Sequence, residues 1–130
     1  MLKLTIPVEP MGAVRMTSRG KPNAQRYLAY KDQIKWIVKQ QLKDRKLLMG
    51  ALEVEISFMM PIPKSWSNVK RQQMVGEYHT KKPDTDNLVK GVFDSLNKLV
   101  WQDDNKVAKV TAVKSYGEVP GMEIVIKELK

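Results

Sequence analysis

Residues 82–90 read KPDTDNLVK, and residues 94–105 read DSLNKLVWQDDN. Five of the seven Asp residues of the chain fall between positions 84 and 104, a window with only two basic residues, Lys90 and Lys98, and a net charge of −3. The whole chain has a net charge of +9, so this is an acidic segment in a basic protein. Clustered carboxylates repel one another unless a cation or a proton occupies the cluster. Because carboxylate oxygens are ligands that Mg²⁺ prefers, we interpret the segment as a candidate site for a divalent metal.

The same stretch predicts the central helix of the fold. Asp84 or Thr85 is placed to cap its start, and an apolar stripe follows at helical spacing, formed by Leu88, Val92, Leu96 and Leu99 or Val100. A different face of this helix presents Asp86, Lys90 and Asp94, each one turn from the next. Gly91 lies within the helix at a cost of about 1 kcal/mol relative to Ala, which indicates close packing at that point.

Hydrophobic periodicity predicts the strands and helices that lie before and after this central helix in the sequence. Alternation predicts strands over residues 2–6 and 52–58, and spacings of three and four predict a helix over residues 23–44. A short helix should begin at Ser65 or Ser67, reach residue 75 and stop at Gly76. Two last strands, 107–116 and 122–128, flank a turn rich in Gly and Pro, which predicts an antiparallel hairpin at the C-terminus.

Length and composition narrow the class of protein. A chain of 130 residues is expected to form one domain, residues 1–130, and an isoelectric point of about 9.8 favours nucleic acid as the partner over an anionic membrane. The absence of Cys excludes disulfides, Cys-ligated zinc and iron–sulfur clusters, and it suits a cytoplasmic location. The sequence shows neither an apolar run of about 20 residues nor a signal-peptide pattern, so we expect no membrane association.

Simpler interpretations exist for each part of the acidic segment. Acidic residues at a helix start favour the helix dipole, Lys90 can form exposed ion pairs one turn away, and residues 103–105 can be an ordinary turn. None of these explains why Asp is concentrated here. A calcium-binding EF-hand loop starting at Asp84 would require an oxygen ligand where Leu88 stands and Gly where Val89 stands. A zinc site is disfavoured because His79 is the one His of the chain.

Basic and aromatic residues outside the acidic segment leave several interpretations open. The loop over residues 10–22 is either a solvated turn or an arm that contacts phosphates. Four lysines recur at every fourth position of the 23–44 helix, which is typical of a solvated face and would also suit an anionic partner: Lys31, Lys35, Lys39 and Lys43. Trp36 is expected in the core, with a dimer contact or base stacking as alternatives, and His79 is expected to be structural unless it contacts phosphate.

The combined pattern resembles the RusA family of Holliday-junction resolvases, which are typical of bacteriophages and prophages. The resemblance rests on KPDTDNLVK at 82–90, on DSLN at 94–97 and on WQDD at 101–104, with weaker similarity upstream at 79–81, 61–66 and 15–21. It implies an α+β fold, with a small mixed sheet packed against helices, in a homodimer that binds four-way DNA and makes two symmetric cuts with Mg²⁺ or Mn²⁺. Thr85 and Gly91 depart from the residues common in the family, and neither is a proposed ligand.

The resemblance also assigns roles to residues. It implies that the metal-binding carboxylates are Asp84, Asp86 and Asp104, that Lys90 is the catalytic lysine, and that Asn87, Asp94 and Asp103 have supporting roles. The charge pattern adds candidate phosphate contacts at Arg15, Arg19, Lys21, Arg26, Lys31, Lys81 and Lys82. We therefore expect a Mg²⁺-dependent crossover-junction endonuclease of DNA recombination and repair. The alternatives are a metal-dependent nuclease for other branched DNA and a non-catalytic DNA-binding protein.

Overall fold

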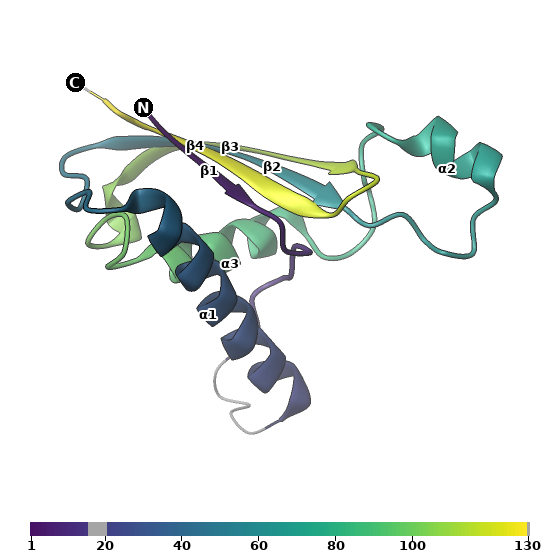
Figure 1. Ribbon diagram of the computed structural model, residues 1–130, viewed down its shortest axis with the longest axis horizontal. Coiled ribbons are helices and arrows are strands. Elements are labelled where there is room, and N and C mark those ends of the chain that lie inside the picture. Colours follow the sequence, from purple (N-terminus) through teal and green to yellow (C-terminus); the bar gives the residue numbers. More distant parts are fainter. Residues whose placement is uncertain (16–20, 130) are drawn as a thin grey trace.

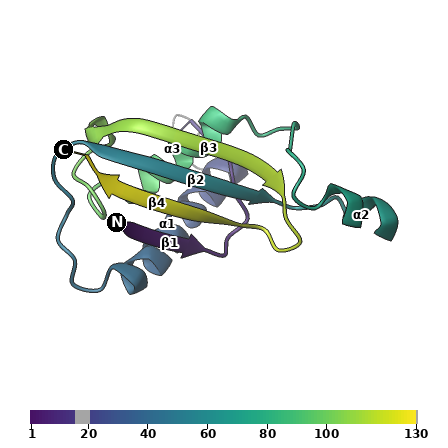
Figure 2. The ribbon, with the colours of Figure 1, turned by 90° about the horizontal axis from the view of Figure 1, so that it is seen from above.

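The computed structural model describes residues 1–15 and 21–129 (Figure 1). In chain order its elements are β1 (Leu2–Ile6), α1 (Pro22–Leu42), β2 (Leu52–Met60), α2 (Asn68–Met74), α3 (Thr85–Leu96), the 3-10 helix η2 (Asp104–Lys106), β3 (Val107–Tyr116) and β4 (Gly121–Glu128). The four strands form one sheet, and α1 and α3 cover the same face of it (Figures 1 and 2). This is the mixed-sheet α+β architecture expected from the sequence.

The sheet has the order β1-β4-β2-β3, with β3 parallel to β2 and the other neighbouring pairs antiparallel. The two C-terminal strands run antiparallel to each other and are joined by a short turn, as expected, but β2 lies between them and pairs with both. The turn crosses the end of β2 closely, since the Gly117 N–H donates to the Met60 carbonyl at 3.0 Å. A Cβ atom at position 117 would lie 2.9 Å from Cβ of Met59, so this crossing requires glycine.

The hydrophobic core lies between the sheet and the two long helices. Every second strand residue points toward the helices, and Leu4, Ile56 and Ile124 are at most 2% exposed. α3 contributes the apolar stripe predicted from the sequence, with Leu88, Val92 and Leu96 fully buried. Burial of one such side chain contributes about 1.5–3 kcal/mol to stability. The stripe therefore fixes which face of α3 is left for the acidic residues.

α1 matches the predicted helix closely but presents its tryptophan to solvent. The buried side chains of this helix are Ala24, Tyr27, Tyr30, Ile34, Val38 and Leu42. The expectation that Trp36 belongs to the core is wrong, because its side chain is 66% exposed. Trp36 follows Tyr27 by nine residues, which at 100° per residue places it on the opposite side of the helix.

The chain after α3 turns back on itself. The helix ends at Leu96, earlier than the apolar stripe indicated, and Lys98 adopts a left-handed φ of 67°. The Lys98 N–H donates to the Trp101 carbonyl at 2.6 Å, and the indole N–H of Trp101 donates to Asn97 Oδ1 at 2.6 Å. Trp101 is fully buried, so it anchors this turn in the core. The turn directs residues 103–104 back toward the end of α3.

α2 lies beyond the end of β2, away from α1 and α3 (Figures 1 and 2). Of the two predicted caps, Ser67 is used: its hydroxyl accepts a hydrogen bond from the Lys70 N–H at 3.2 Å. Gly76 follows the helix with a φ of 85°, as its predicted stop. The chain then returns along the outer edge of β3. There the Gly76 N–H donates to the Tyr116 carbonyl at 2.8 Å, and the His79 N–H donates to the Lys114 carbonyl at 3.0 Å. This pairing delivers the chain to the start of α3.

Within residues 1–15 and 21–129, no helix combines the length and the apolar character needed to cross a membrane.

Candidate active site

The turn over residues 81–83, which leads into α3, is held by a lysine from β3. The Lys114 ammonium donates to the Lys81 carbonyl at 2.6 Å and to the Pro83 carbonyl at 2.8 Å. Lys114 is in register with Phe58 of β2, so it points to the face of the sheet that the helices cover. It thereby fixes the backbone immediately before Asp84. Sequence reasoning missed this residue, although a lysine in line with Val110, Ala112 and Tyr116 is a detectable signal.

The start of α3 presents its acidic side chains to solvent. Asp84 is the N-cap residue by backbone conformation, but its side chain accepts no capping hydrogen bond from the helix. Asp84 and Asp86 are both exposed. Asp84 and Asn87 line a shallow cavity of about 300 Å³ together with Lys82 and Pro83. These carboxylates are therefore free of partners in α3 and accessible to a ligand from outside.

Asn87 joins the N-terminal segment to α3. Its side-chain amide donates to the Ala13 carbonyl at 3.2 Å, and the Ala13 N–H donates to the Asn87 carbonyl at 3.2 Å. A Cβ atom at Gly12 would lie 3.1 Å from the Asn87 amide nitrogen, so the segment passes close to the helix. This contact brings exposed Arg15, two residues further along, to the vicinity of the helix start. Asn87 thus holds the backbone of the N-terminal segment, and its supporting role in catalysis stays a prediction.

The second half of α3 gathers a polar cluster around Asp94. One Asp94 oxygen accepts a hydrogen bond from the Tyr27 hydroxyl at 2.9 Å, and the other lies 3.7 Å from the Lys90 ammonium. Asp104 lies beside Asp94 and Asp103. Partial burial raises the pKa of the Asp104 carboxyl, the neighbouring Asp103 and Asp94 carboxylates raise it further, and a hydrogen bond with Asn97 opposes the increase. Asp104 therefore lies in a partly buried position beside two carboxylates of like charge.

Asp103 shapes the turn that carries Asp104. Its Oδ1 atom accepts a hydrogen bond from the Asn105 N–H at 3.2 Å and caps η2. Asp103 therefore holds the turn next to Asp104, and its supporting role in catalysis stays a prediction.

The carboxylates fit a divalent metal by their chemistry. Among the residues that the structure describes, no three acidic or histidine side chains stand close enough together to form a metal-binding group. Asp94 and Asp103 are neighbours of Asp104, but the three do not form such a group, and Asp84 and Asp86 are at the other end of α3. The predicted set of Asp84, Asp86 and Asp104 therefore stays a prediction. All of the proposed donors are carboxylate oxygens, which suit Mg²⁺.

Most candidate phosphate contacts are exposed and have no acidic partner. Among the described residues, ion pairs link Lys90 to Asp94, Lys109 to Glu53 and Lys127 to Glu55, and these pairs include none of the described candidate DNA-binding residues. The exposed candidates are Arg15, Lys21, Arg26, Lys81 and Lys82. Arg26 donates to the Asn23 side chain, and the Lys31 ammonium lies 4.6 Å from the centre of the Tyr27 ring. Arg19 lies outside the described residues.

His79 has a packing role. Its ring lies 4.9 Å from that of Tyr116, and burial, with a smaller contribution from the Lys114 ammonium, lowers its pKa. This agrees with the structural interpretation made from the sequence.

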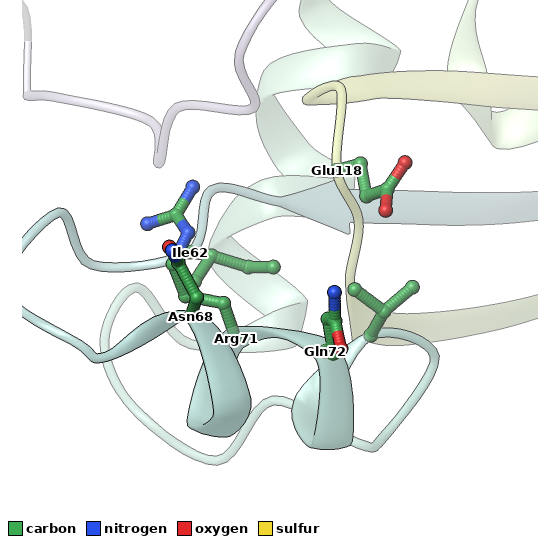
Figure 3. A pocket seen from close by; sticks show the side chains of 6 residues that line it. Ile62, Asn68, Arg71, Gln72 and Glu118 are labelled. Atoms are coloured by element: carbon green, nitrogen blue, oxygen red, sulfur yellow. The ribbon is translucent and has the colours of Figure 1, made fainter.

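A separate cavity of about 340 Å³ lies at α2 (Figure 3), and α2 lies away from α1 and α3 (Figure 1). Its lining comes from α2, the chain after β2 and the turn after β3: Ile62, Asn68, Arg71, Gln72, Val75 and Glu118. This lining contains a single carboxylate and no Asp. The acidic site, by contrast, lies on an open surface, which suits a polymeric substrate better than a small molecule.

Comparisons with known proteins identify the family of this chain. The family model described as Endodeoxyribonuclease RusA matches residues 7–127. The chain is also similar to the uncharacterized protein YqaN of Bacillus subtilis (strain 168), with 36% identity over 97 residues, 72% of this chain and 68% of that protein. The family match includes all of α1, α2 and α3 and every proposed site residue. The chain therefore belongs to the RusA family of endodeoxyribonucleases.

Proposed function

We propose that this protein, as a single domain over residues 1–130, is a divalent-metal-dependent endodeoxyribonuclease that resolves four-way DNA junctions. Membership of the RusA family supports endonuclease activity on Holliday junctions. The structural observation that supports it most directly is α3 itself. This helix has two exposed carboxylates at its start and an acidic cluster at its end, within a chain of net charge +9.

The proposed metal ligands are Asp84, Asp86 and Asp104, with Mg²⁺ as the ion and Mn²⁺ as a possible substitute. When bound, a divalent ion neutralises charge on the scissile phosphate and lowers the pKa of a water molecule, so that hydroxide is available at neutral pH. The exposed carboxylates at the helix start would orient this ion toward solvent, where a DNA strand has access. Asp103 and Asn97 keep Asp104 in place by shaping the turn after α3.

Lys90 is the proposed electrostatic catalyst. It lies one helical turn after Asp86 and one turn before Asp94, and its side chain is 66% exposed. An ammonium in this position would stabilise the negative charge that develops on phosphate oxygens in the transition state. Its contact with Asp94 at 3.7 Å limits where the ammonium can move.

The unpaired basic residues around α3 would bind the DNA backbone. Such contacts give affinity that depends on salt and little on sequence. A four-way junction has near two-fold symmetry, and one chain contributes one site. A C₂ homodimer would therefore place two sites on one junction and make paired cuts.

The test compares wild type, Asp86→Asn and Asp44→Asn on a labelled four-way junction, a flap and a linear duplex, each with Mg²⁺ and with EDTA. Asp44 is also an exposed carboxylate, just after α1, and serves as the matched control. We expect Mg²⁺-dependent nicks in the junction alone for wild type and Asp44→Asn. Asp86→Asn should lose cleavage and bind the junction at least as tightly, because a negative charge is removed.

Three outcomes would count against the proposal, each in a different way. Near-normal cutting by Asp86→Asn would show that the proposed site is wrong. Equal cutting of flap and duplex would leave the metal site standing and reject junction specificity. Binding without cutting, in both Mg²⁺ and Mn²⁺, would identify a non-catalytic DNA-binding protein.

A further inference from the structure

A buried tyrosine from α1 reaches the acidic cluster of α3. Tyr27 is 1% exposed, yet its hydroxyl donates a hydrogen bond to Asp94 Oδ2 at 2.9 Å, across 67 residues of sequence. Burial raises the pKa of the Tyr27 phenol, and the bond to Asp94 raises it further, so the hydroxyl keeps its proton and remains the donor. The roles proposed for the metal ligands and for Lys90 do not account for this contact between Tyr27 and Asp94.

Gly91 permits the close approach of the two helices. A Cβ atom at position 91 would lie 3.2 Å from the Met11 carbonyl oxygen and 3.6 Å from a carbon of the Tyr27 ring. The close packing that the sequence indicated at Gly91 is thus confirmed. Because the ring rests against the helix backbone, its hydroxyl is placed one turn further along, at Asp94.

Asp94 connects the buried hydroxyl to the exposed lysine. Its Oδ1 atom lies 3.7 Å from Lys90 Nζ, and the side chains of Lys90 and Asp94 are 66% and 29% exposed. An exposed ion pair one turn apart on a helix is worth only a few tenths of a kcal/mol, which is too little to hold a lysine in one place. A carboxylate whose second oxygen is fixed by a rigid, buried phenol has few rotamers left. It therefore offers Lys90 a partner at a constant position.

We propose that Tyr27 is a positioning residue for phosphodiester cleavage, which fixes Asp94 and through it the Lys90 ammonium. The inference rests on the proposed function, in which Lys90 stabilises charge on the phosphate. Tyr27 touches neither DNA nor metal in this account. Its effect should therefore appear in the rate of the cleavage step, and junction affinity should not change.

The chain offers a matched pair of variants, Tyr27→Phe and Tyr30→Phe. Each removes one hydroxyl oxygen from a buried ring of α1, and the two rings lie 6.3 Å apart. The Tyr30 hydroxyl lies 3.5 Å from the Met122 sulfur and has a hydrogen bond with the Met11 backbone, and neither of these partners is charged. We expect Tyr27→Phe to reduce the single-turnover cleavage rate about tenfold, the size of one hydrogen bond to a charged group. Tyr30→Phe should cut at the wild-type rate, and both variants should bind the junction with wild-type affinity.

A double-mutant cycle tests the route through Asp94. In an Asp94→Asn background, the further change Tyr27→Phe should reduce the rate by less than twofold, because the carboxylate that it positions is gone. A full tenfold loss in that background would overturn the proposal, as would a wild-type rate for Tyr27→Phe alone. A loss confined to junction affinity would also overturn it, since it would assign Tyr27 to DNA binding.

An activity-independent measurement separates this inference from the proposed function. Carbon-13 relaxation at the Lys90 ε-methylene of the free protein should show greater motion in Tyr27→Phe than in wild type or Tyr30→Phe. Unchanged relaxation would overturn the positioning role even if the protein cuts junctions. If Tyr27→Phe increases the motion of the Lys90 side chain but the wild-type protein cuts no junction, the coupling between the residues is confirmed and the proposed function is rejected instead.

Discussion

At the scale of single residues, the structure adds partners that lie far away in sequence. The i to i+4 spacing of Lys90 and Asp94 predicted one contact correctly, since helix geometry determines it. The contacts of Tyr27 with Asp94 and of Lys114 with Pro83 depend on how α1 and β3 are placed against α3. Local periodicity has no information about such placement, so both residues were assigned only to a helix face or a strand.

Replacing Lys114 by Met should destabilise the fold by about 1–3 kcal/mol, because two carbonyls lose a charged donor. The control is Lys109→Met on the same strand. Lys109 is largely exposed and pairs with Glu53 at 3.3 Å, a surface contact worth at most about 1 kcal/mol. Urea unfolding of both variants measures the difference. Equal free energies of unfolding for Lys114→Met and Lys109→Met would show that the Lys114 contacts do not hold the turn before Asp84.

The single histidine gives a prediction about pH. The pKa of His79 is lowered in the folded state from its usual value of 6.5, so at pH below about 6.5 the unfolded chain binds a proton that the folded chain resists. Stability should therefore decline as the pH falls through this window. Asp104, whose pKa is raised, acts in the opposite direction, so the informative quantity is the difference between wild type and His79→Gln. If the difference in unfolding free energy between wild type and His79→Gln stays constant between pH 8 and pH 5, the pKa of His79 is not lowered in the folded state.

At the scale of elements, every predicted helix and strand is present within a few residues of its expected bounds. The order of the strands in the sheet could not be predicted from the sequence, because the pairing of β2 with both β3 and β4 depends on contacts between distant parts of the chain. The early end of α3 was missed for a related reason. Burial of Trp101 draws the chain out of the helix, and an apolar residue in the pattern does not reveal which turn it will occupy.

The lysines of α1 offer a test at this scale. Lys31 lies over the Tyr27 ring, whose hydroxyl reaches Asp94, so the flank of α1 with Lys31 and Lys35 borders the acidic site. Replacing both by Ala should weaken junction binding and reduce the slope of log affinity against log salt by about 1.8, which is about 0.9 for each phosphate that no longer has a lysine partner. The control pair, Lys3→Ala with Lys109→Ala, removes the same charge from the opposite face of the sheet. Equal slopes for the two pairs would assign the α1 lysines to solvent.

At the scale of the whole molecule, charge separation is the feature that the sequence predicted best. The chain is strongly basic, and five of its seven Asp residues lie at the start of α3, within it or in the turn that follows it. The sequence correctly placed Asp84 at the start of α3 and Asp86 and Asp94 within it, whereas the meeting of Asp94 with Asp104 depends on the fold-back at Trp101. Helical spacing thus predicted where Asp86 and Asp94 lie, and tertiary packing determines that Asp94 meets Asp104.

The most direct test of the central claim uses a supercoiled plasmid that extrudes a cruciform, followed over time on an agarose gel. Metal-dependent resolution by a two-fold symmetric dimer predicts linear plasmid with little accumulation of nicked circles in Mg²⁺, and uncut plasmid in EDTA. A matched plasmid without the inverted repeat should remain supercoiled. Linear product in EDTA, or equal cutting of the plasmid that lacks the cruciform, would contradict the account.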